Sequence, residues 1–207
     1  YICMFPQITS GPIMRYEDAL EGLAGERIHP ERFEEGLRLL ILGLAAKVLL
    51  ADRLGILWND IRTIGFESIS TPLAWLGAFA YSLQLYFDFE GYSLMAAGIG
   101  IMLGFPYIQN FNQPYSAVSV SDFWRRWHIT LGSWFRDYVY IPMGGNRKGT
   151  RRLILNLAFV WLLTGIWHGN GLNFIRWGLV RGGLIMLEKL TYGKWLQKTK
   201  VLSHVYV

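Results

Sequence analysis

The sequence predicts an all-α, multi-spanning helical membrane protein. Hydrophobic residues make up 52% of its 207 residues and charged residues only 17%, where soluble domains average about 25% charged. No Asp, Glu, Lys or Arg occurs in Ser68–Phe87, nor between Arg152 and Arg176, and about 20 such residues can cross a bilayer core of about 30 Å. Nine Trp and eleven Tyr suit the two membrane interfaces.

The first third of the chain divides into a broken segment, a polar segment and an apolar segment. Prolines and a glycine argue against a regular helix in residues 1–16. Residues 17–36 alternate charged and small residues, which predicts a surface segment with a helix start at Pro30. Residues 37–57 are apolar but interrupted by Lys47, Asp52 and Arg53, so a membrane helix and a tilted interfacial helix both remain open.

Two membrane helices are predicted next. The first covers Ser68–Phe87, with Pro72 in its first turn. The sequence from Asp88 to Glu90 then separates it from a second helix that ends at Leu103. Residues 105–114 are too polar and proline-rich to face lipid, so we expect a non-helical segment covered by protein or water. Asp88 and Glu90 can form a carboxylate pair for acid/base chemistry, or they can mark the end of a helix.

A basic amphipathic helix is predicted over residues 122–138, capped by Ser119 or Ser121. Aromatic and apolar residues recur on one face at about 100° per residue, and arginines occupy the other face. This pattern is typical of a helix at a membrane interface. His128 lies at the edge of the apolar face.

The most basic loop precedes the last two predicted helices. Four basic residues lie between Arg147 and Arg152, which predicts a cytoplasmic loop. Helices are then expected at Leu153–His168 and Leu172–Leu190. A straight helix from the loop would place His168 about 22 Å from it, at membrane depth.

The two histidines are the strongest candidates for chemistry. An ionisable residue at membrane depth is a functional-site candidate by default, and a neutral imidazole can take a proton from a hydroxyl. His168 can equally be bonded to a neighbouring helix, and His128 can be an ordinary interfacial histidine. Cys3 is the single cysteine, so no internal disulfide and no cysteine-based metal site is expected, and no HExxH metal-binding motif is present. The net charge of +5 fits the basic loops of membrane proteins better than nucleic-acid binding.

Three segments together resemble the membrane-bound O-acyltransferase (MBOAT) family, in its alginate O-acetyltransferase-like branch. They are SDFWRRWHITL from Ser121, FRDYVYIPMGGNR from Phe135 and GIWHG from Gly165. The segments around Phe5–Ile13 and Tyr86–Ser93 are also similar to that branch. The resemblance implies many membrane helices around a tunnel, through which an acetyl group from cytosolic acetyl-CoA or a similar donor passes towards an extracytoplasmic sugar hydroxyl.

The resemblance also implies roles for individual residues. His168 matches the main catalytic histidine of the family, and His128 matches the second. Three arginines are candidates for binding the phosphates of the donor, with solvation at the surface as the alternative role of each: Arg125, Arg126 and Arg136. At Arg181 the branch usually has a further histidine, and arginine cannot act as a base near neutral pH.

The sequence therefore predicts an O-acetyltransferase of MBOAT type, multi-pass in the bacterial cytoplasmic (inner) membrane. It would act on hydroxyls of an exported polysaccharide, with the lipid bilayer and an extracytoplasmic acetyl-accepting protein as partners, acetyl-CoA as donor substrate, no bound cofactor and no nucleic acid. Residues 1–207 would form one membrane-embedded core, a fragment truncated at both ends. Transfer of D-alanyl or another acyl group to a cell-wall polymer is the alternative. A second alternative is a non-catalytic membrane scaffold, which Arg181 suggests.

Overall fold

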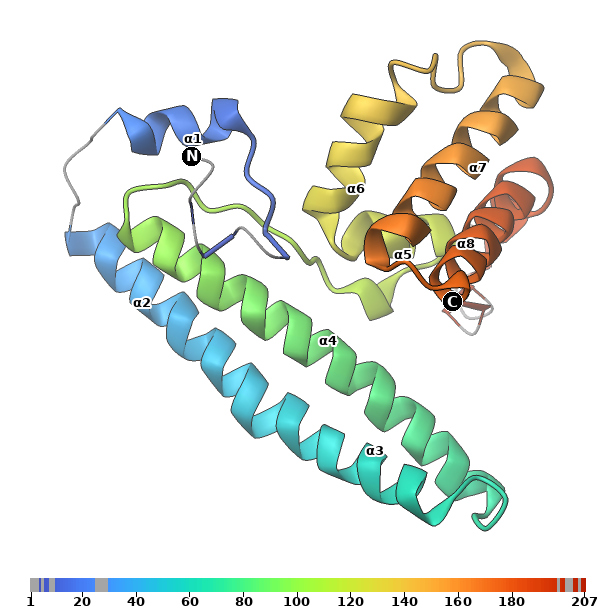
Figure 1. The fold of residues 1–207 in the computed structure, drawn as a ribbon, viewed down its shortest axis with the longest axis horizontal. Helices are drawn as coiled ribbons and strands as arrows, with labels where there is room; N and C mark the ends of the chain where they lie inside the picture. The colour runs from blue at the N-terminus through green and yellow to red at the C-terminus, as the bar shows by residue number, and fades with distance from the viewer. Residues whose placement is uncertain are drawn as a thin grey trace. The chain divides into compact units, whose positions relative to one another are not determined.

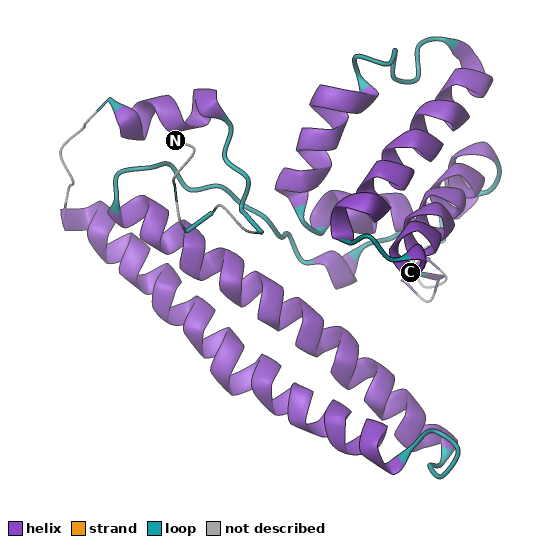
Figure 2. Ribbon diagram, viewed as in Figure 1, coloured by secondary structure: helices purple, strands orange, loops and turns teal. Residues whose placement is uncertain are grey.

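The computed structural model describes residues 4, 6, 7, 10–24, 30–196, 198, 199, 203, 204, 206 and 207. In this part of the chain every regular element is a helix, as Figure 2 shows, which confirms the all-α prediction there. The chain forms two compact units, Tyr1–Asn110 and Phe111–Val207 (Figure 1). The single membrane-embedded core over the whole chain stays a prediction.

The first unit is built on a long helical hairpin. Its elements are α1 (Tyr16–Leu23), α2 (Pro30–Ala45), the π-helical η1 (Ala46–Ala51), α3 (Asp52–Ile64) and α4 (Thr71–Met102). The helix start predicted at Pro30 is confirmed. From α2 to α3 the chain runs in one direction, and α4 returns along it in contact with all three (Figure 1).

The prediction of two helices in residues 68–103 is wrong, because α4 is one helix of 32 residues. A Cβ atom on Gly91 would lie 2.7 Å from the carbonyl oxygen of Gly43. Gly91 therefore allows two helix backbones to approach, and it does not mark a break. The charge of Asp88 does not break the helix either, since its carboxylate lies 2.7 Å from Lys47 Nζ. Lys47 lies 2.7 Å from Asp52 as well, so these three charges are paired.

We expect Gly91→Ala to destabilise the hairpin by about 1–2 kcal/mol, since the cost of overpacking exceeds the gain in helix propensity. The atom that a Cβ would meet is a backbone carbonyl oxygen, which cannot rotate away. Thermal unfolding of the full-length protein in detergent measures the loss. Gly55→Ala in α3 is the matched control, because its Cβ would meet only the Gln84 side chain at 3.6 Å. An equal loss in both variants would contradict the close approach.

The second unit carries seven short or medium helical elements in its described part. They are η2 (Pro114–Ser116), α5 (Val120–Arg126), α6 (Ile129–Phe135), the π-helical η3 (Arg136–Tyr140), α7 (Gly149–His168), α8 (Leu172–Leu190) and α9 (Gly193–Leu196). Glycines bring α7 and α8 together, and a Cβ on Gly165 would lie 2.6 Å from the carbonyl oxygen of Phe174. A buried cluster of Val120, Leu157, Trp161 and Ile185 joins α5 to both helices.

The amphipathic helix predicted over residues 122–138 is divided into α5, α6 and η3. Between α5 and α6 the backbone of His128 takes a left-handed conformation with φ 46°, which no continuous helix permits. Ser119 is the cap, since its side-chain oxygen accepts a hydrogen bond from the Asp122 N–H at 3.0 Å. The prediction for α8 is confirmed at both ends, whereas α7 begins at Gly149, before the predicted Leu153.

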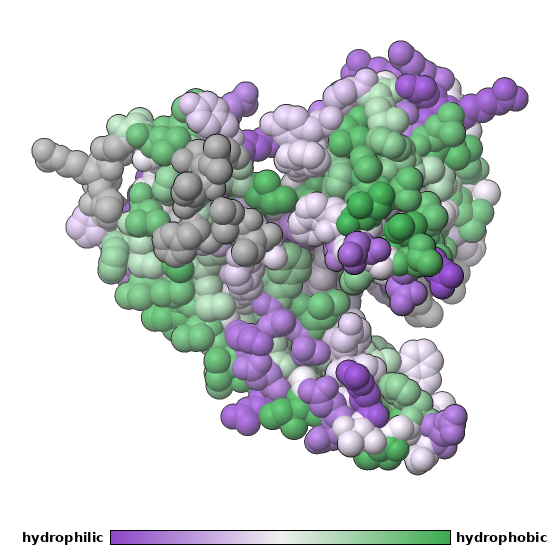
Figure 3. All heavy atoms as spheres, in the orientation of Figure 1, coloured by the Kyte–Doolittle hydropathy of each residue, from purple (hydrophilic) through white to green (hydrophobic). Residues whose placement is uncertain are grey.

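The surface is apolar over large parts of both units. Figure 3 shows hydrophobic residues along α2 and hydrophilic residues over the loop before α7. Exposed large apolar side chains include Ile41, Leu49, Trp75 and Phe79, and apolar patches of this kind are typical of contact with lipid or with another protein surface. None of the helices in the described residues meets, in both length and apolarity, what crossing a bilayer requires.

Candidate active site

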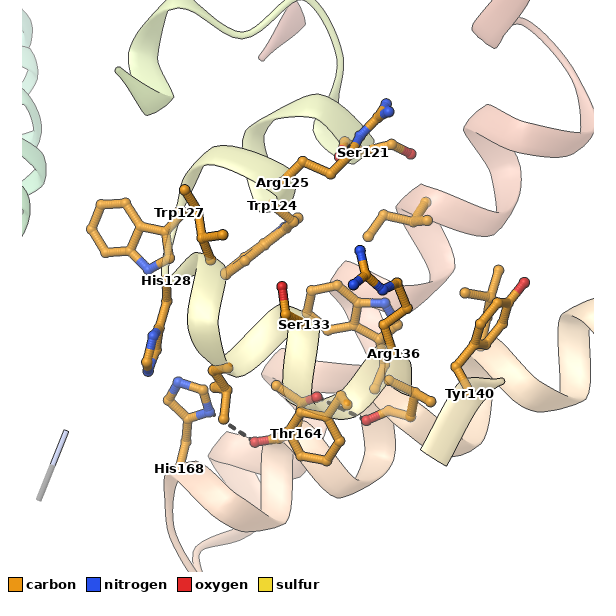
Figure 4. A pocket seen from close by; sticks show the side chains of 18 of the residues that line it. Ser121, Trp124, Arg125, Trp127, His128, Ser133, Arg136, Tyr140, Thr164 and His168 are labelled. Atoms are coloured by element: carbon orange, nitrogen blue, oxygen red, sulfur yellow. Dashed lines mark hydrogen bonds between the residues drawn. The ribbon is translucent and has the colours of Figure 1, made fainter. Parts of the chain in front are cut away.

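A cavity of about 600 Å³ lies within the second unit (Figure 4). Residues of α5, α6, η3, α7 and α8 line it. Its apolar wall includes Trp124, Leu131, Phe135, Leu157, Val160, Trp161 and Ile185. Its polar groups include both predicted histidines, two of the predicted arginines, and residues that the sequence analysis did not single out. Apolar walls with a few polar groups are typical of small-molecule sites.

His128 is held rigidly between α5 and α6. Its carbonyl oxygen accepts the first hydrogen bond of α6, from the Gly132 N–H at 3.1 Å. The left-handed backbone is less costly for histidine than for most side chains. Only 4% of the residue is exposed, and this burial lowers the pKa of His128 from 6.5 to about 3, with repulsion from His168 adding to the effect. His128 is therefore neutral at physiological pH.

His168 is the last residue of α7. Its Nδ1 lies 2.8 Å from the Thr164 carbonyl oxygen, which can only accept a hydrogen bond. Nδ1 therefore carries the proton, and Nε2 holds the lone pair that can take a proton from a substrate. The ring packs against Trp177, with a centroid distance of 4.7 Å.

The fold brings the two histidines together from separate helices. Figure 4 shows the two imidazole rings next to each other at one end of the cavity. Trp167 lies beside both, with its ring centroid 4.9 Å from that of His168 and 5.9 Å from that of His128. Because like charges this close disfavour each other, the nearby His168 adds to the lowering of the pKa of His128 that burial causes.

Two of the three predicted donor-binding arginines line the cavity, namely Arg125 and Arg136. Arg136 is also bound to its neighbour Asp137, with Nε and Oδ1 2.7 Å apart. Arg126 lies outside the lining, and its Nε is 2.9 Å from Asp122.

Sequence reasoning missed Tyr140 and Lys189, which also line the cavity. No local pattern could have found them, because they reach the cavity only through the packing of η3 and α8. Arg181, which departs from the branch pattern, is exposed on α8 and is not among the lining residues. In the described part of the chain, no group of three or more His, Cys, Asp or Glu is placed to hold a metal ion.

The motifs around this cavity carry the relationship to known proteins. The family model of the membrane-bound O-acyltransferases matches residues 1–206. The chain belongs to the MBOAT family. This confirms the predicted family. The family is one of membrane-bound enzymes, as its name states.

Similar MBOAT proteins differ in the polymer that their names give. The chain is 42% identical, over 91% of its length and 38% of the relative, to a probable alginate O-acetylase AlgI of Pseudomonas fluorescens. It is 39% identical to a peptidoglycan O-acetyltransferase of Helicobacter pylori, over 88% of the chain and 35% of the relative. It is 29% identical to a teichoic acid D-alanyltransferase of Bacillus subtilis, over 98% of the chain and 53% of the relative. The chain thus spans little more than a third of the two O-acetyltransferases.

Proposed function

We propose that the full-length protein is a membrane O-acetyltransferase that moves acetyl groups from a thioester donor towards hydroxyls of an exported polysaccharide. The observation that carries this proposal is the pair His128 and His168 at one end of a cavity with cationic side chains elsewhere in its lining. The identity to O-acetyltransferases, at 42% and 39%, supports acetyl as the transferred group.

His168 acts as the general base in this proposal. Its Nε2 takes the proton of the acceptor hydroxyl while the hydroxyl oxygen attacks the acetyl carbonyl carbon. The new C–O bond forms, the C–S bond of the thioester breaks, and the leaving thiolate takes the proton back from Nε2. General acid–base help of this kind contributes about 10²–10⁴-fold to rate.

His128 orients the donor in this proposal. Because its pKa is lowered to about 3, it is a neutral hydrogen-bonding group at pH 7 and can donate to the acetyl carbonyl oxygen. A hydrogen-bonding group that is already held in place stabilises the carbonyl oxygen more than a mobile group does. Arg125 and Arg136 would contact phosphates of acetyl-CoA, the proposed donor substrate. Arg126, bound to Asp122, would support the end of α5 instead.

The proposed setting is the bacterial cytoplasmic membrane, crossed several times by the full-length protein. The acceptor would be an extracytoplasmic polysaccharide, reached directly or through an acetyl-accepting partner protein. The 29% identity to a teichoic acid D-alanyltransferase is the observation that supports the alternative, D-alanyl transfer. A non-catalytic scaffold is disfavoured, because Arg181 is not in the cavity lining and both histidines are present there.

The test is a transfer assay with the full-length protein in lipid vesicles. Radiolabelled acetyl-CoA and a D-alanylated carrier protein are offered in separate reactions, with alginate or a peptidoglycan fragment as acceptor. Label in the polymer from acetyl-CoA is the expected result. Label only from the D-alanyl donor would replace the proposal by its alternative, D-alanyl transfer. If neither donor labels the polymer, the non-catalytic scaffold is the hypothesis that remains.

The basic loop is expected to face the cytoplasm, on the side where the donor is made. Four basic residues between Arg147 and Arg152 favour that side. A cysteine at the exposed position Thr150, in a variant without Cys3, should resist a membrane-impermeant thiol reagent in intact cells and react after the cells are opened. Rapid labelling in intact cells would reverse the topology.

A further inference from the structure

His168, the proposed base, has no carboxylate partner in the described part of the chain. Its Nδ1 donates a hydrogen bond to the Thr164 carbonyl oxygen at 2.8 Å, which is a neutral acceptor. The residues that line the cavity include three cations and no carboxylate. When Nε2 takes the proton of the acceptor hydroxyl, the ring becomes an imidazolium, and its positive charge then has no anionic partner.

Two indole rings lie next to the imidazole of His168. The ring centroid of Trp177 is 4.7 Å from that of His168, and the ring centroid of Trp167 is 4.9 Å from it. A cation within about 6 Å of an indole centroid is attracted by the negative potential of the ring face. Both indoles are therefore close enough to attract a positively charged His168.

Trp177 is the better placed of these two indoles. Trp167 is 47% exposed, so water screens its attraction for a cation. Trp177 is partly buried and packs against the hydrophobic cluster that joins α5, α7 and α8. Cation–π interactions are stronger where the groups are removed from water, so the larger contribution is expected from Trp177.

Two further indoles hold Trp177 in place. Its ring centroid lies 5.6 Å from that of Trp124 and 6.3 Å from that of Trp161, and both pairs meet edge to face. Trp124 and Trp161 also meet edge to face, at 5.1 Å. This is a preferred arrangement of aromatic rings, so the three indoles fix one another. A group that is already fixed needs no reorganisation when the charge on His168 forms.

The close approach of α7 and α8 sets the distance between His168 and Trp177. A Cβ on Gly178, the residue after Trp177, would clash with the carbonyl oxygen of Trp161 and would lie 3.1 Å from the Cα of Gly165. Gly165 precedes His168 on α7 by about one turn. The two helix backbones therefore touch beside both residues, and this contact places the indole against the imidazole.

We infer that Trp177 is a positioning residue for the proposed acetyl transfer: its indole holds the ring of His168 and stabilises the imidazolium that forms during proton transfer. This inference rests on the proposed function. The indole does by a cation–π interaction what the carboxylate of a Ser-His-Asp triad does for its histidine, which it orients and stabilises as the imidazolium. Trp177 is not among the cavity-lining residues, so it acts through His168 and does not contact the substrate.

The experiment measures kcat and KM for acetyl-CoA with the full-length protein as wild type, Trp177→Phe and Trp177→Leu. Loss of the cation–π interaction is expected to lower kcat about 5–30-fold in Trp177→Leu, with KM unchanged because only the transition state is affected. Trp177→Phe keeps a ring that attracts cations less strongly, and it should lose less. Trp195→Leu is the matched control and should keep the wild-type kcat, because Trp195 is an exposed tryptophan of the same unit outside the cavity lining.

A fluorinated tryptophan at position 177 separates the stabilisation of charge from packing. Fluorine withdraws electrons from the indole face and weakens its attraction for a cation, while the size of the side chain changes little. In full-length protein that carries the fluorinated residue at this position alone, kcat should fall as fluorine atoms are added. The amount of folded protein in gel filtration should stay the same.

The other outcomes separate this inference from the proposed function. An unchanged kcat across the fluorinated series would overturn the inference, even where Trp177→Leu is inactive or unfolded, because the indole would then only fill space. A raised KM with an unchanged kcat in Trp177→Leu would also overturn it, since Trp177 would then bind the donor. A wild type that transfers no acetyl group from acetyl-CoA would overturn the proposed function, and this inference with it.

Discussion

His168→Ala in the full-length protein is expected to abolish acetyl transfer and to leave the protein folded in the membrane. His168 is exposed within this chain, so its removal creates no cavity in the core, and surface substitutions change stability by only about 0.5 kcal/mol. Its Nε2 is the proposed base, and the loss of a general base lowers turnover by about 10²–10⁴-fold. The transfer assay with labelled acetyl-CoA measures activity, and gel filtration in detergent measures folded protein.

His168→Gln tests the chemistry more sharply. The glutamine side chain can still donate a hydrogen bond to the Thr164 carbonyl oxygen, as Nδ1 does at 2.8 Å, but it cannot take up a proton at pH 7. We expect it to be as inactive as the alanine variant. His204→Ala is a matched control, because His204 belongs to the same unit and lies outside the cavity lining. Transfer near the wild-type rate in His168→Gln would exclude proton transfer by this residue.

Sequence patterns predicted those parts of the fold whose causes are local. The start of α2 was predicted from Pro30, and both ends of α8 were predicted from a largely apolar segment that carries Arg176 and Arg181. The motifs also indicated the family, and they indicated His128 and His168 as a pair without showing that the two rings meet.

The rest depends on contacts between distant residues. Asp88 and Glu90 look like a helix break in the sequence, and only the ion pair of Asp88 with Lys47 and the approach of Gly91 to the Gly43 carbonyl oxygen show why the helix continues. His128 fits an unbroken amphipathic pattern, since periodicity carries no information on its left-handed backbone. Lys189 follows Glu188 at the end of an ordinary helix, and its place in the cavity becomes visible only when α8 lies against α5.

Acid is expected to destabilise the second unit through His128. In the folded protein the pKa of this histidine is about 3, against 6.5 for a solvated side chain. Between these values the unfolded chain binds a proton that the folded protein excludes, so stability falls as the pH falls below 6.5 and is unaffected above it. From pH 7 to pH 4 the loss from this residue is about 3 kcal/mol, at 1.36 kcal/mol for each unit.

His128→Asn isolates this contribution, because asparagine tolerates the left-handed backbone and cannot be protonated. Thermal unfolding of the full-length protein at pH 7 and pH 4 should show a smaller acid effect in this variant than in wild type, while His204→Asn keeps the wild-type difference. An acid effect equal in His128→Asn and wild type would contradict the buried neutral state.

The same variant separates the two roles of His128. If the neutral ring orients the donor, His128→Asn should lower turnover at pH 7 while the protein stays folded, since asparagine is shorter and cannot reach the same acceptor. If turnover persists at the wild-type rate, His128 only shapes the break between α5 and α6, and His168 performs the transfer without it. His128→Ala cannot decide between these roles, because alanine adds the cost of the left-handed backbone, about 1–2 kcal/mol, to the loss of the ring.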